Sequence, residues 1–296
     1  MIWGKEKRLC ILYALTPVHA GSGQALRAVD LPIQRERHTG IPIVQSSGIK
    51  GSIRDWCEKA WGSEGKDLAD KIFGKAGETG SNWAGAVTLT DAKLLLFPVR
   101  SNVAPFVHIT SPSVLKRFKD DMDLIGGHEI PEIVNLTNSE HYVPLMGNFD
   151  DDVILEDIIV KKASNSAYKT WGDKLREVFT DLINAKVILV TDEVFGYLTR
   201  MATEVQAHIA IEDETGTAKD GSLRYQEYLP SDSVLYFVAF FADVRAKDAS
   251  GIKASEVARK ITDGGVSSHI QIGGDFTLGK GICKVRWIKP SVGGRS

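Results

Sequence analysis

The stretch TPVHAGSGQALRAVDLPIQRERHTGIPIVQSSGIKGSIR, residues 16–54, joins the first predicted strand of this chain to its first predicted helix. It contains His19 at the end of the strand, the loop Gly21-Ser22-Gly23, and one aspartate, Asp30, among cationic neighbours. Glycine leaves the backbone free to bend, and a local group of cations attracts polyanions. The stretch therefore suits a polyanionic ligand and offers Asp30 as a group that can do chemistry on it.

Hydrophobic periodicity predicts the elements on both sides of this stretch. The apolar run at residues 9–15 predicts a strand that ends at Thr16-Pro17. Ser46 or Ser47 is a typical N-cap, and the apolar spacing after them predicts a helix to about residue 60. The next predicted elements are a helix at 66–73 and a strand at 86–98.

The second half of the chain has interleaved strand and helix signals. Two predicted strands flank the polar tip 212–221, which indicates a hairpin over about 205–228. Between about 100 and 170 the pattern is weak, which predicts a long helical or irregular insertion. Because the order is not a regular βαβ repeat, we predict an α+β fold in a single domain, 1–296, with antiparallel sheet covered by helices. The other predicted elements are helices at 173–182, 192–201 and 254–262, and strands at 187–191, 233–244, 269–272 and 281–289.

Composition limits the class of protein. The chain has 296 residues, 43% of them hydrophobic, and a formal net charge of -2, so bulk charge does not predict nucleic-acid binding. Three scattered cysteines without a CxxC pair argue against a disulfide framework or a thiolate zinc site. No apolar run approaches the roughly 18 residues of a membrane span, and no signal peptide is recognisable. We expect a soluble cytoplasmic protein with no membrane partner.

The segment GGDFTLGKG, residues 273–281, partly matches a phosphate-binding loop. Gly274, Gly279 and Lys280 have the right spacing. Position 281 is Gly where Ser or Thr should bind magnesium, and a strand is predicted where a helix should follow. This argues against a nucleotide triphosphatase. Two interpretations stay open, a glycine loop that passes close to a nucleic-acid backbone and a plain hairpin turn.

Asp30 and His19 each have two interpretations. Asp30 can form a surface ion pair with Arg27 or Arg35, or it can bind a divalent metal or transfer a proton during phosphodiester cleavage. His19 can be a hydrogen-bonded loop residue, or it can contact a phosphate or act as an acid or base.

Lys50 and Arg54 are four positions apart on one predicted helix, so both side chains lie on the same face and can reach phosphates. A solvated helix face is the alternative. The nearby cations favour the phosphate interpretation, and they are Arg27, Arg35, Arg37 and His38.

Three separated motifs resemble the RAMP superfamily of CRISPR effector proteins, in particular the backbone subunits of the type III-B (Cmr) RNA-targeting complex. The motifs are HxGSGxxxxxxDLPIQRERHTGIPIVQSSGIKGSIR, TGTAKDGSLRYQEYLP and GGDFTLGKG, in the family's order. Together they span most of the chain, and the portion from IQRERHTG to KGSIR is the most specific. Residues 100–170 match no motif of the family.

The resemblance implies a modified RRM-like (ferredoxin-like) palm, a β-hairpin thumb over 205–228, and copies of the subunit stacked head to tail along a guide RNA. Other Cmr subunits and a target RNA are the further implied partners. Each thumb would displace one nucleotide of the guide–target duplex, and the loop bearing Asp30 would cut the target RNA there, at regular intervals.

The resemblance also implies roles for individual residues. Asp30 would be the catalytic residue and the ligand of a divalent metal ion, Mg or Mn. His19, Glu227 and Tyr228 would support it. The alternatives are a non-catalytic RNA-binding scaffold and a stand-alone guide-processing ribonuclease that uses His19. The implied RNA-binding residues are Arg27, Arg35, Arg37, His38, Lys50, Arg54, Gly273, Gly274, Gly279, Lys280 and Gly281.

Overall fold

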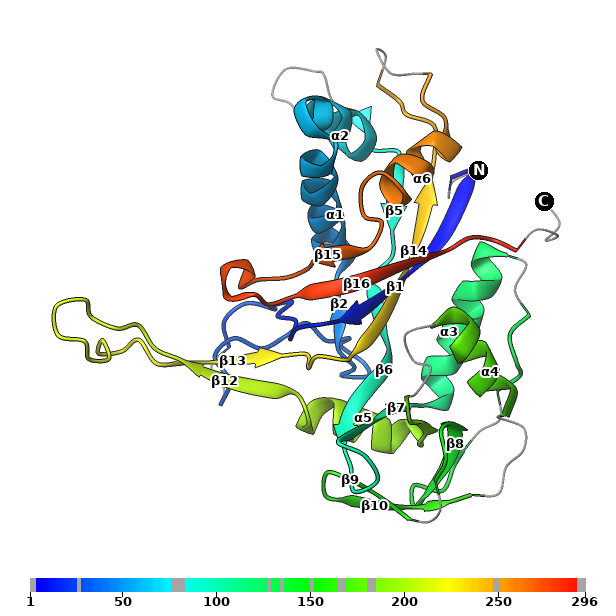
Figure 1. Cartoon of the computed structure of the whole chain (residues 1–296), viewed down its shortest axis with the longest axis vertical. Coiled ribbons are helices and arrows are strands. Elements are labelled where there is room, and N and C mark those ends of the chain that lie inside the picture. Colours follow the sequence, from blue (N-terminus) through cyan, green and yellow to red (C-terminus); the bar gives the residue numbers. More distant parts are fainter. Residues whose placement is uncertain are drawn as a thin grey trace.

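A 12-stranded sheet runs through the computed structural model of this chain, and helices cover both of its faces (Figure 1). The structure describes residues 4–25, 28–75, 83–126, 129–133, 136–149, 152–163, 169–179, 185–246 and 251–291. The strands of the large sheet are β1 (Glu6–Ala14), β2 (Ile43–Val44), β5 (Val87–Leu89), β6 (Ala92–Arg100), β7 (Phe106–Thr110), β8 (His141–Met146), β9 (Val153–Leu155), β10 (Ile158–Lys162), β11 (Val187–Leu189), β14 (Val234–Phe241), β15 (His269–Gln271) and β16 (Ile282–Ile288). The helices are α1 (Ser46–Ala60), α2 (Gly65–Phe73), α3 (Pro112–Ile125), α4 (Lys169–Val178), α5 (Asp192–Met201) and α6 (Ala254–Thr262).

The centre of the sheet consists of β16, β1, β14 and β6, in that order, with antiparallel pairing throughout. In chain order these elements are β1, α1, β6, β14, α6 and β16, so one helix follows the first strand and one precedes the last. The two helices are neighbours, because the Trp61 indole at the end of α1 donates to the Lys260 carbonyl oxygen of α6 at 3.2 Å.

Consecutive residues of β14 face opposite sides of the sheet, as the pleat requires. Tyr236 packs against Phe118 of α3, whereas Phe237 packs against Trp287. The Trp287 indole donates to the carbonyl oxygen of Val266, just after α6, at 2.7 Å. The helices α3 and α6 therefore cover opposite faces, which explains why all eight residues of β14 are buried and apolar.

The region 100–170 contains strands as well as a helix, so the prediction that it is helical or irregular is wrong. It contributes β7 to β10 and the helix α3, and these strands extend the large sheet beyond β6. The pairings of β7 with β11 and of β8 with β10 are parallel, so the sheet is mixed and not purely antiparallel. Short strands that pair across long sequence separations leave little local periodicity to detect.

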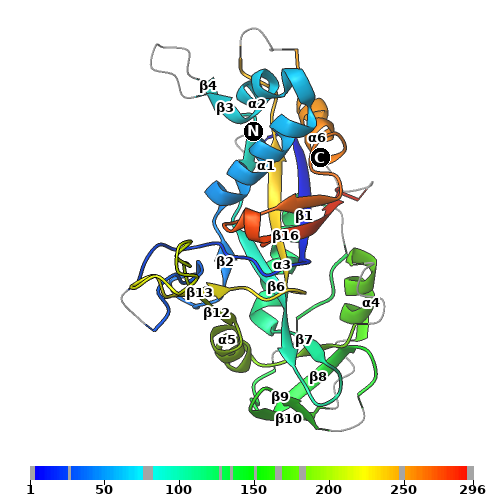
Figure 2. The same cartoon turned by 60° about the vertical axis from the view of Figure 1, so that its left-hand side comes forward.

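A two-stranded hairpin, β12 (Glu204–His208) and β13 (Arg224–Tyr228), projects from the body of the molecule (Figure 1). In the view of Figure 2 its base lies beside the segment that follows β1, on the same side as the start of α1. The hairpin was predicted from its two strands and polar tip, although β12 ends three residues before the predicted boundary at 211. A second small ribbon, β3 (Gly74–Lys75) with β4 (Trp83–Ala84), lies near α2.

Most other predicted elements are confirmed. The helices α1, α2, α5 and α6 begin and end within one residue of the predicted ranges, whereas the predicted strand at 86–98 is divided into β5 and β6. All three cysteines are buried and free. Within the described residues, no helix combines the length and the apolar character needed to cross a membrane.

Candidate functional site

The segment around Asp30 runs alongside β13 and bonds to its free edge, like a third strand of the hairpin. The amides of Asp30 and Leu31 both donate to the Tyr225 carbonyl oxygen at 3.1 Å, and the Glu227 amide donates to the Leu31 carbonyl oxygen at 3.0 Å. Because β12 occupies the other edge of β13, the Asp30 segment covers the edge that would otherwise be open. The position of the segment therefore depends directly on the hairpin.

The Asp30 carboxylate lies at the surface in a fixed orientation. Its Oδ2 accepts a hydrogen bond from the Tyr225 amide at 2.8 Å, and the residue is half-buried. It lines an open cavity of about 390 Å³ together with Gln24, Ala25, Leu223 and Arg224. One carboxylate oxygen is thus held by the protein while the side chain faces a space that a ligand can enter.

Of the two arginines considered as surface partners of Asp30, the structure describes only Arg35. Arg35 pairs with Glu227 instead. Arg27 lies outside the described residues, so its predicted contact with RNA and its alternative pairing with Asp30 are not described.

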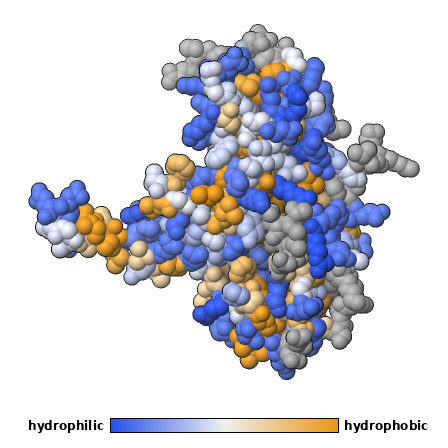
Figure 3. All heavy atoms as spheres, in the orientation of Figure 1, coloured by the Kyte–Doolittle hydropathy of each residue, from blue (hydrophilic) through white to orange (hydrophobic). Residues whose placement is uncertain are grey.

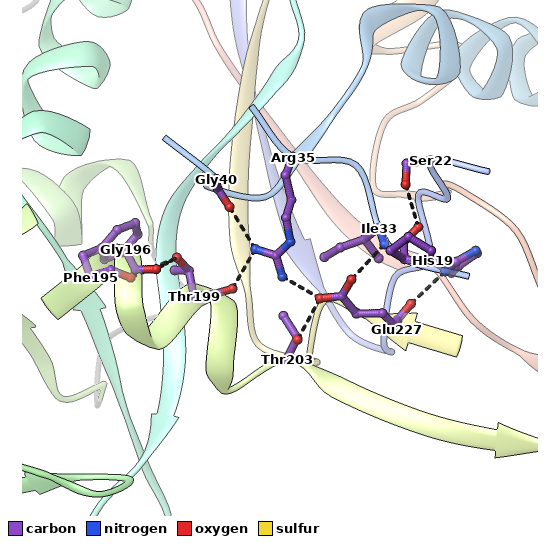
Figure 4. A network of polar contacts seen from close by, with 11 residues as sticks. His19, Ser22, Ile33, Arg35, Gly40, Phe195, Gly196, Thr199, Thr203 and Glu227 are labelled. Carbon is purple, nitrogen blue, oxygen red and sulfur yellow. Dashed lines mark hydrogen bonds and ion pairs between the residues drawn. The ribbon is translucent and has the colours of Figure 1, made fainter. Parts of the chain in front are cut away.

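Glu227 and Arg35 form a polar clamp beside the Asp30 segment (Figure 4). Glu227 Oε1 accepts from Arg35 Nη2 at 2.5 Å and from the Thr203 hydroxyl at 2.9 Å, and its Oε2 accepts from the Ile33 amide at 3.0 Å. Arg35 Nη1 also donates to the carbonyl oxygens of Gly40 and Thr199, both at 2.9 Å. With Glu227 only 7% exposed, this clamp fastens the Asp30 segment to the hairpin and to α5.

His19 is buried beneath two glycine-rich segments. Its Nδ1 lies 2.7 Å from the Glu227 carbonyl oxygen, and its ring packs against Tyr228 with 5.5 Å between centroids. A Cβ on Gly21 would lie 2.7 Å from His19 Nε2, and a Cβ on Gly273 would lie 2.4 Å from the His19 carbonyl oxygen. Glycine at these positions lets both loops approach His19 closely, so the structure gives this residue a packing role.

The glycine loop 273–281 is fastened to the hairpin by Asp275, which sequence reasoning missed. Asp275 has a φ of 59°, a left-handed conformation that Asp tolerates better than most residues. Its Oδ2 accepts from the side-chain Nε2 of Gln226 and, at 2.9 Å, from the Tyr228 hydroxyl. Burial and the hydrogen bond to Asp275 raise the pKa of Tyr228, so its hydroxyl remains a hydrogen-bond donor even under alkaline conditions.

Lys280 completes this contact between the loop and the hairpin. Its Nζ donates to Gln206 Oε1 at 3.1 Å and lies 4.8 Å from the centre of the Tyr228 ring. The short 3₁₀ turn Phe276–Leu278 is followed by the strand β16, so the loop lacks the helix of a nucleotide triphosphatase phosphate loop. Gly274, Gly279 and Gly281 lie in this same loop, and its glycines other than Gly281 are exposed.

The predicted phosphate-binding cations fall into two groups. Arg54 donates to the Gly74 carbonyl oxygen at 2.8 Å and pairs with Asp70, so it joins α1 to α2 and β3. Arg37 and His38 are exposed, and Lys50 is half-buried in the first turns of α1. Burial and the charge of Arg54 lower the pKa of Lys50. Within the described chain, no carboxylate lies within ion-pair distance of Arg37 or Lys50, whereas His38 lies 3.9 Å from Glu36.

The residues near Asp30 do not form a complete metal site. In the part of the chain that the structure describes, no three His, Cys, Asp or Glu side chains are grouped to hold a metal ion. Magnesium is commonly bound through one or two carboxylates together with substrate phosphates and water. The arrangement therefore fits only an ion that shares Asp30 with a phosphate ligand.

One face of the hairpin is apolar and exposed. Val205, Ile209, Leu223 and Tyr225 are 49%, 51%, 55% and 42% exposed. They are odd-numbered positions on the two strands and their extensions, so they share one face, and Figure 3 shows hydrophobic side chains along the projecting hairpin. This apolar stripe leads from the tip of the hairpin to the base where Asp30 lies.

Comparison with known proteins gives consistent matches. The model of the RAMP superfamily matches residues 11–284. A Pyrococcus furiosus protein named CRISPR system Cmr endoribonuclease Cmr4 is 37% identical over 284 residues, which cover 93% of both chains. A Saccharolobus solfataricus protein named CRISPR system CMR subunit Cmr4 is 24% identical over 308 residues, 93% of this chain and 94% of the other.

Solved structures agree in fold. A crystal structure of oligomeric Cmr4 from Pyrococcus furiosus superposes with a TM-score of 0.71 at 29% identity, covering 96% of this chain and 98% of the other. A chain of the cryo-EM structure of the type III-B Cmr-beta complex bound to cognate target RNA has a TM-score of 0.74 at 22% identity, again covering 96% and 98%. The mixed α/β architecture with its large sheet is therefore that of the Cmr4 structures.

Proposed function

Since this chain belongs to the RAMP superfamily, we propose that it is a backbone subunit of a type III-B (Cmr) CRISPR complex, which binds guide RNA and cleaves the paired target RNA. The relative that is 37% identical is named an endoribonuclease, and it is matched over 93% of its length. The proposed reaction is cleavage of a phosphodiester bond in the target strand, with Asp30 as the catalytic residue.

The observation that carries the proposal is the place of Asp30. Its carboxylate is held by the Tyr225 amide at the base of the hairpin and lines an open cavity. A scaffold gains nothing from a carboxylate near phosphates, because like charges repel. A group that accepts a proton from the RNA does need that position.

We interpret the centre of the sheet as an RRM-like palm. A βαββαβ chain with the strand order β16-β1-β14-β6 has the arrangement of ferredoxin-like folds, and here α1 and α6 are its two helices. In the same interpretation 1–296 is a single domain, 100–170 is an insertion into it, and the hairpin is the thumb.

The apolar face of the thumb suits the displacement of a nucleotide. Apolar and aromatic side chains such as Leu223 and Tyr225 can take the place of a neighbouring base in a stack. A displaced nucleotide can bring its 2′-oxygen, phosphorus and leaving 5′-oxygen into line, which a stacked A-form nucleotide cannot. Distortion by the thumb would therefore supply much of the catalysis.

The chemistry at this position is a transesterification within the target strand. Asp30 takes the proton of the 2′-hydroxyl, the 2′-oxygen bonds to phosphorus, and the bond from phosphorus to the 5′-oxygen breaks. The leaving oxygen takes a proton from water, so the products carry a 2′,3′-cyclic phosphate and a 5′-hydroxyl. Proton transfer of this kind contributes about two to four orders of magnitude in rate.

A divalent ion, Mg or Mn, fits this scheme as an ion that Asp30 holds jointly with the RNA. When bound, such an ion supplies neutralisation of phosphate charge. Oδ1 of Asp30, which has no hydrogen-bond donor among the described residues, would be its protein ligand, because Oδ2 accepts from the Tyr225 amide.

Guide RNA would lie along the cations and the glycine loop. Arg37, His38 and Lys50 are the predicted contacts that are free to reach phosphates, and the exposed backbone of the glycine loop allows close approach. Arg35, Arg54 and Lys280 have intramolecular partners, so their predicted contacts with RNA compete with structural roles. Further copies of this chain and other Cmr subunits would extend the assembly along the guide.

A non-catalytic scaffold is the second candidate, and one observation favours it. Three of the four predicted catalytic residues, His19, Glu227 and Tyr228, are buried in structural contacts. A stand-alone guide-processing ribonuclease that uses His19 is less compatible with this burial.

The test compares complexes assembled with wild-type chain and with Asp30→Ala. We expect the Asp30→Ala complex to bind guide and target RNA normally and to cleave target at least about 100-fold more slowly. Normal cleavage by the Asp30→Ala complex would leave only the scaffold. Specific cleavage of repeat RNA by the isolated protein would instead support the stand-alone ribonuclease.

A further inference from the structure

Arg224, which immediately precedes Tyr225 on β13, lies at the same cavity as Asp30. The cavity of about 390 Å³ is lined by both residues and by Gln24, Ala25 and Leu223. Because the Tyr225 amide holds the Asp30 carboxylate, adjacent residues of one strand position the cation and the anion. The backbone of β13 therefore fixes where the Arg224 side chain begins relative to the Asp30 carboxylate.

Among the described residues, Arg224 and Arg37 have no carboxylate within ion-pair distance, whereas other arginines near the site are paired. Arg35 pairs with Glu227, Arg54 with Asp70, and Arg117 with Glu36. For Arg224, which is exposed, the described part of the chain places no carboxylate within ion-pair distance, and Asp30 itself is held by a backbone amide. An exposed guanidinium beside a cavity keeps its five donors available for an incoming ligand.

The cavity has the size and chemistry for one nucleotide with its phosphate. Pockets of about 300–1,000 Å³ are the range that holds small ligands in proteins. Among the described residues, the charged ones that line it are Asp30 and Arg224. The carboxylate suits a hydroxyl that loses a proton, and the guanidinium suits a phosphate, which it can bind through two parallel hydrogen bonds.

We propose that Arg224 binds the non-bridging oxygens of the phosphate that is cleaved and stabilises the charge that this phosphate gains during the reaction. This rests on the proposed nuclease function. As the 2′-oxygen bonds to phosphorus, Asp30 removes its proton and the five-coordinate phosphate carries one more negative charge than the starting diester. The guanidinium faces that charge until the 5′-oxygen leaves and takes a proton from water.

The experiment measures single-turnover cleavage of target RNA by complexes that carry Arg224→Gln, Arg224→Lys or Asp30→Asn. Loss of one preorganised donor to a developing anion typically costs about 10²- to 10³-fold in rate, and we expect this range for Arg224→Gln. Arg224→Lys should retain part of the rate because the charge stays while the paired donors are lost. Lys219→Gln, which removes an exposed cation from the tip of the same hairpin, is the matched control and should cleave at the wild-type rate.

A sulfur substitution in the RNA separates contact with the phosphate from a structural effect. Replacing a non-bridging oxygen at the cleaved phosphate by sulfur should slow the wild-type complex, and the same replacement should have a smaller effect in Arg224→Gln. An equal sulfur effect in both, or equal slowing by Lys219→Gln, overturns the assignment of Arg224.

The two proposals fail in distinguishable ways. If Asp30→Asn cleaves normally, the nuclease function itself is lost. If Asp30→Asn is inactive while Arg224→Gln cleaves within about two-fold of wild type, the role of Asp30 stands and only the inference about Arg224 is overturned.

Discussion

At the scale of the residue, two acids lie at the same hairpin strand in opposite surroundings: Asp30 packs beside β13, and Glu227 belongs to it. Asp30 has one oxygen bound by a backbone amide and faces an open cavity. Glu227 is buried, and both of its oxygens are occupied by Ile33, Arg35 and Thr203. A carboxylate that faces solvent can exchange protons with a substrate, whereas a fully bonded one positions other groups.

Glu227→Gln tests this distinction through stability. The change leaves the Arg35 guanidinium without its carboxylate, so we expect the free energy of unfolding to fall by about 2 kcal/mol. Denaturant unfolding of the purified chain measures it, and Thr203→Val, which removes a single hydrogen bond, should cost about 1 kcal/mol. Abolished target cleavage with unchanged unfolding would mean that Glu227 acts on the RNA itself.

Much of this residue-scale detail could not be predicted from the sequence. The side chains of Arg35 and Glu227 meet across 192 positions, and Asp275 meets Tyr228 across 47. The local sequence pattern does not predict contacts between residues so far apart in the chain, because only the tertiary fold brings them together. Asp30 and the cations around it could be selected as candidates because their stretch resembles the RAMP superfamily. Without that resemblance, a surface ion pair of Asp30 was an equally good interpretation. Arg224 lies within the motif TGTAKDGSLRYQEYLP, but nothing in the sequence singled it out as a functional residue.

At the scale of the element, the glycine loop contains glycines with different roles. The sequence selected them all as RNA-binding residues, but the structure separates them. Gly273 and Gly279 both have left-handed backbone, with φ of 85° and 71°. A Cβ at 273 would lie 2.4 Å from the His19 carbonyl oxygen, whereas a Cβ at 279 would have nothing within 4 Å. The first glycine is thus required for packing and the second only for its conformation.

Alanine at each position should separate these two roles. Gly279→Ala should cost about 1 kcal/mol of folding free energy, the strain of a left-handed alanine. Gly273→Ala should cost clearly more and should expose the Gly274 amide, which donates to the His19 carbonyl oxygen at 2.9 Å, to hydrogen exchange. Equal thermal stability of the two variants, with no change in exchange at Gly274, would contradict the packing described here.

Two cations of the helix α1, Lys50 and Arg54, can be compared in the same way. Lys50→Gln should weaken binding of guide RNA equally for all sequences and lower the slope of log K against log salt by about 0.7 to 1, one phosphate contact, with stability unchanged. Arg54→Gln should lower the unfolding free energy by about 1 kcal/mol, because it breaks the contacts with Asp70 and Gly74. A salt slope that stays the same in Lys50→Gln removes that residue from the RNA surface.

The helices α5 and α6 were predicted best, whereas α3 was not predicted and α4 begins four residues before its predicted start at 173. The apolar spacing and end signals of α5 and α6 are local, and the structure has them at the predicted residues. The region 100–170 was mispredicted because β7 pairs with β6 and β11, and β8 with β11 and β10, so each strand is stabilised by distant partners.

At the scale of the whole molecule, the fold brings three distant parts of the chain to one place. The Asp30 segment, the hairpin base and the glycine loop are joined by hydrogen bonds that involve Tyr225, Gln226 and Tyr228. A force on the hairpin therefore reaches both the candidate catalytic carboxylate and the loop proposed to lie along the guide. This connection gives a physical reason why displacement of a nucleotide and cleavage would occur together.

The most direct measurement of the central claim is the mapping of cut positions and end groups on one target RNA, by complexes that contain wild-type chain or Asp30→Asn. We predict regularly spaced cuts by the wild type, with 2′,3′-cyclic phosphate and 5′-hydroxyl ends. The Asp30→Asn complex, bound to the same target with the same affinity, should leave every one of these positions intact. Cuts by Asp30→Asn at the same positions, with the same ends, would contradict the account.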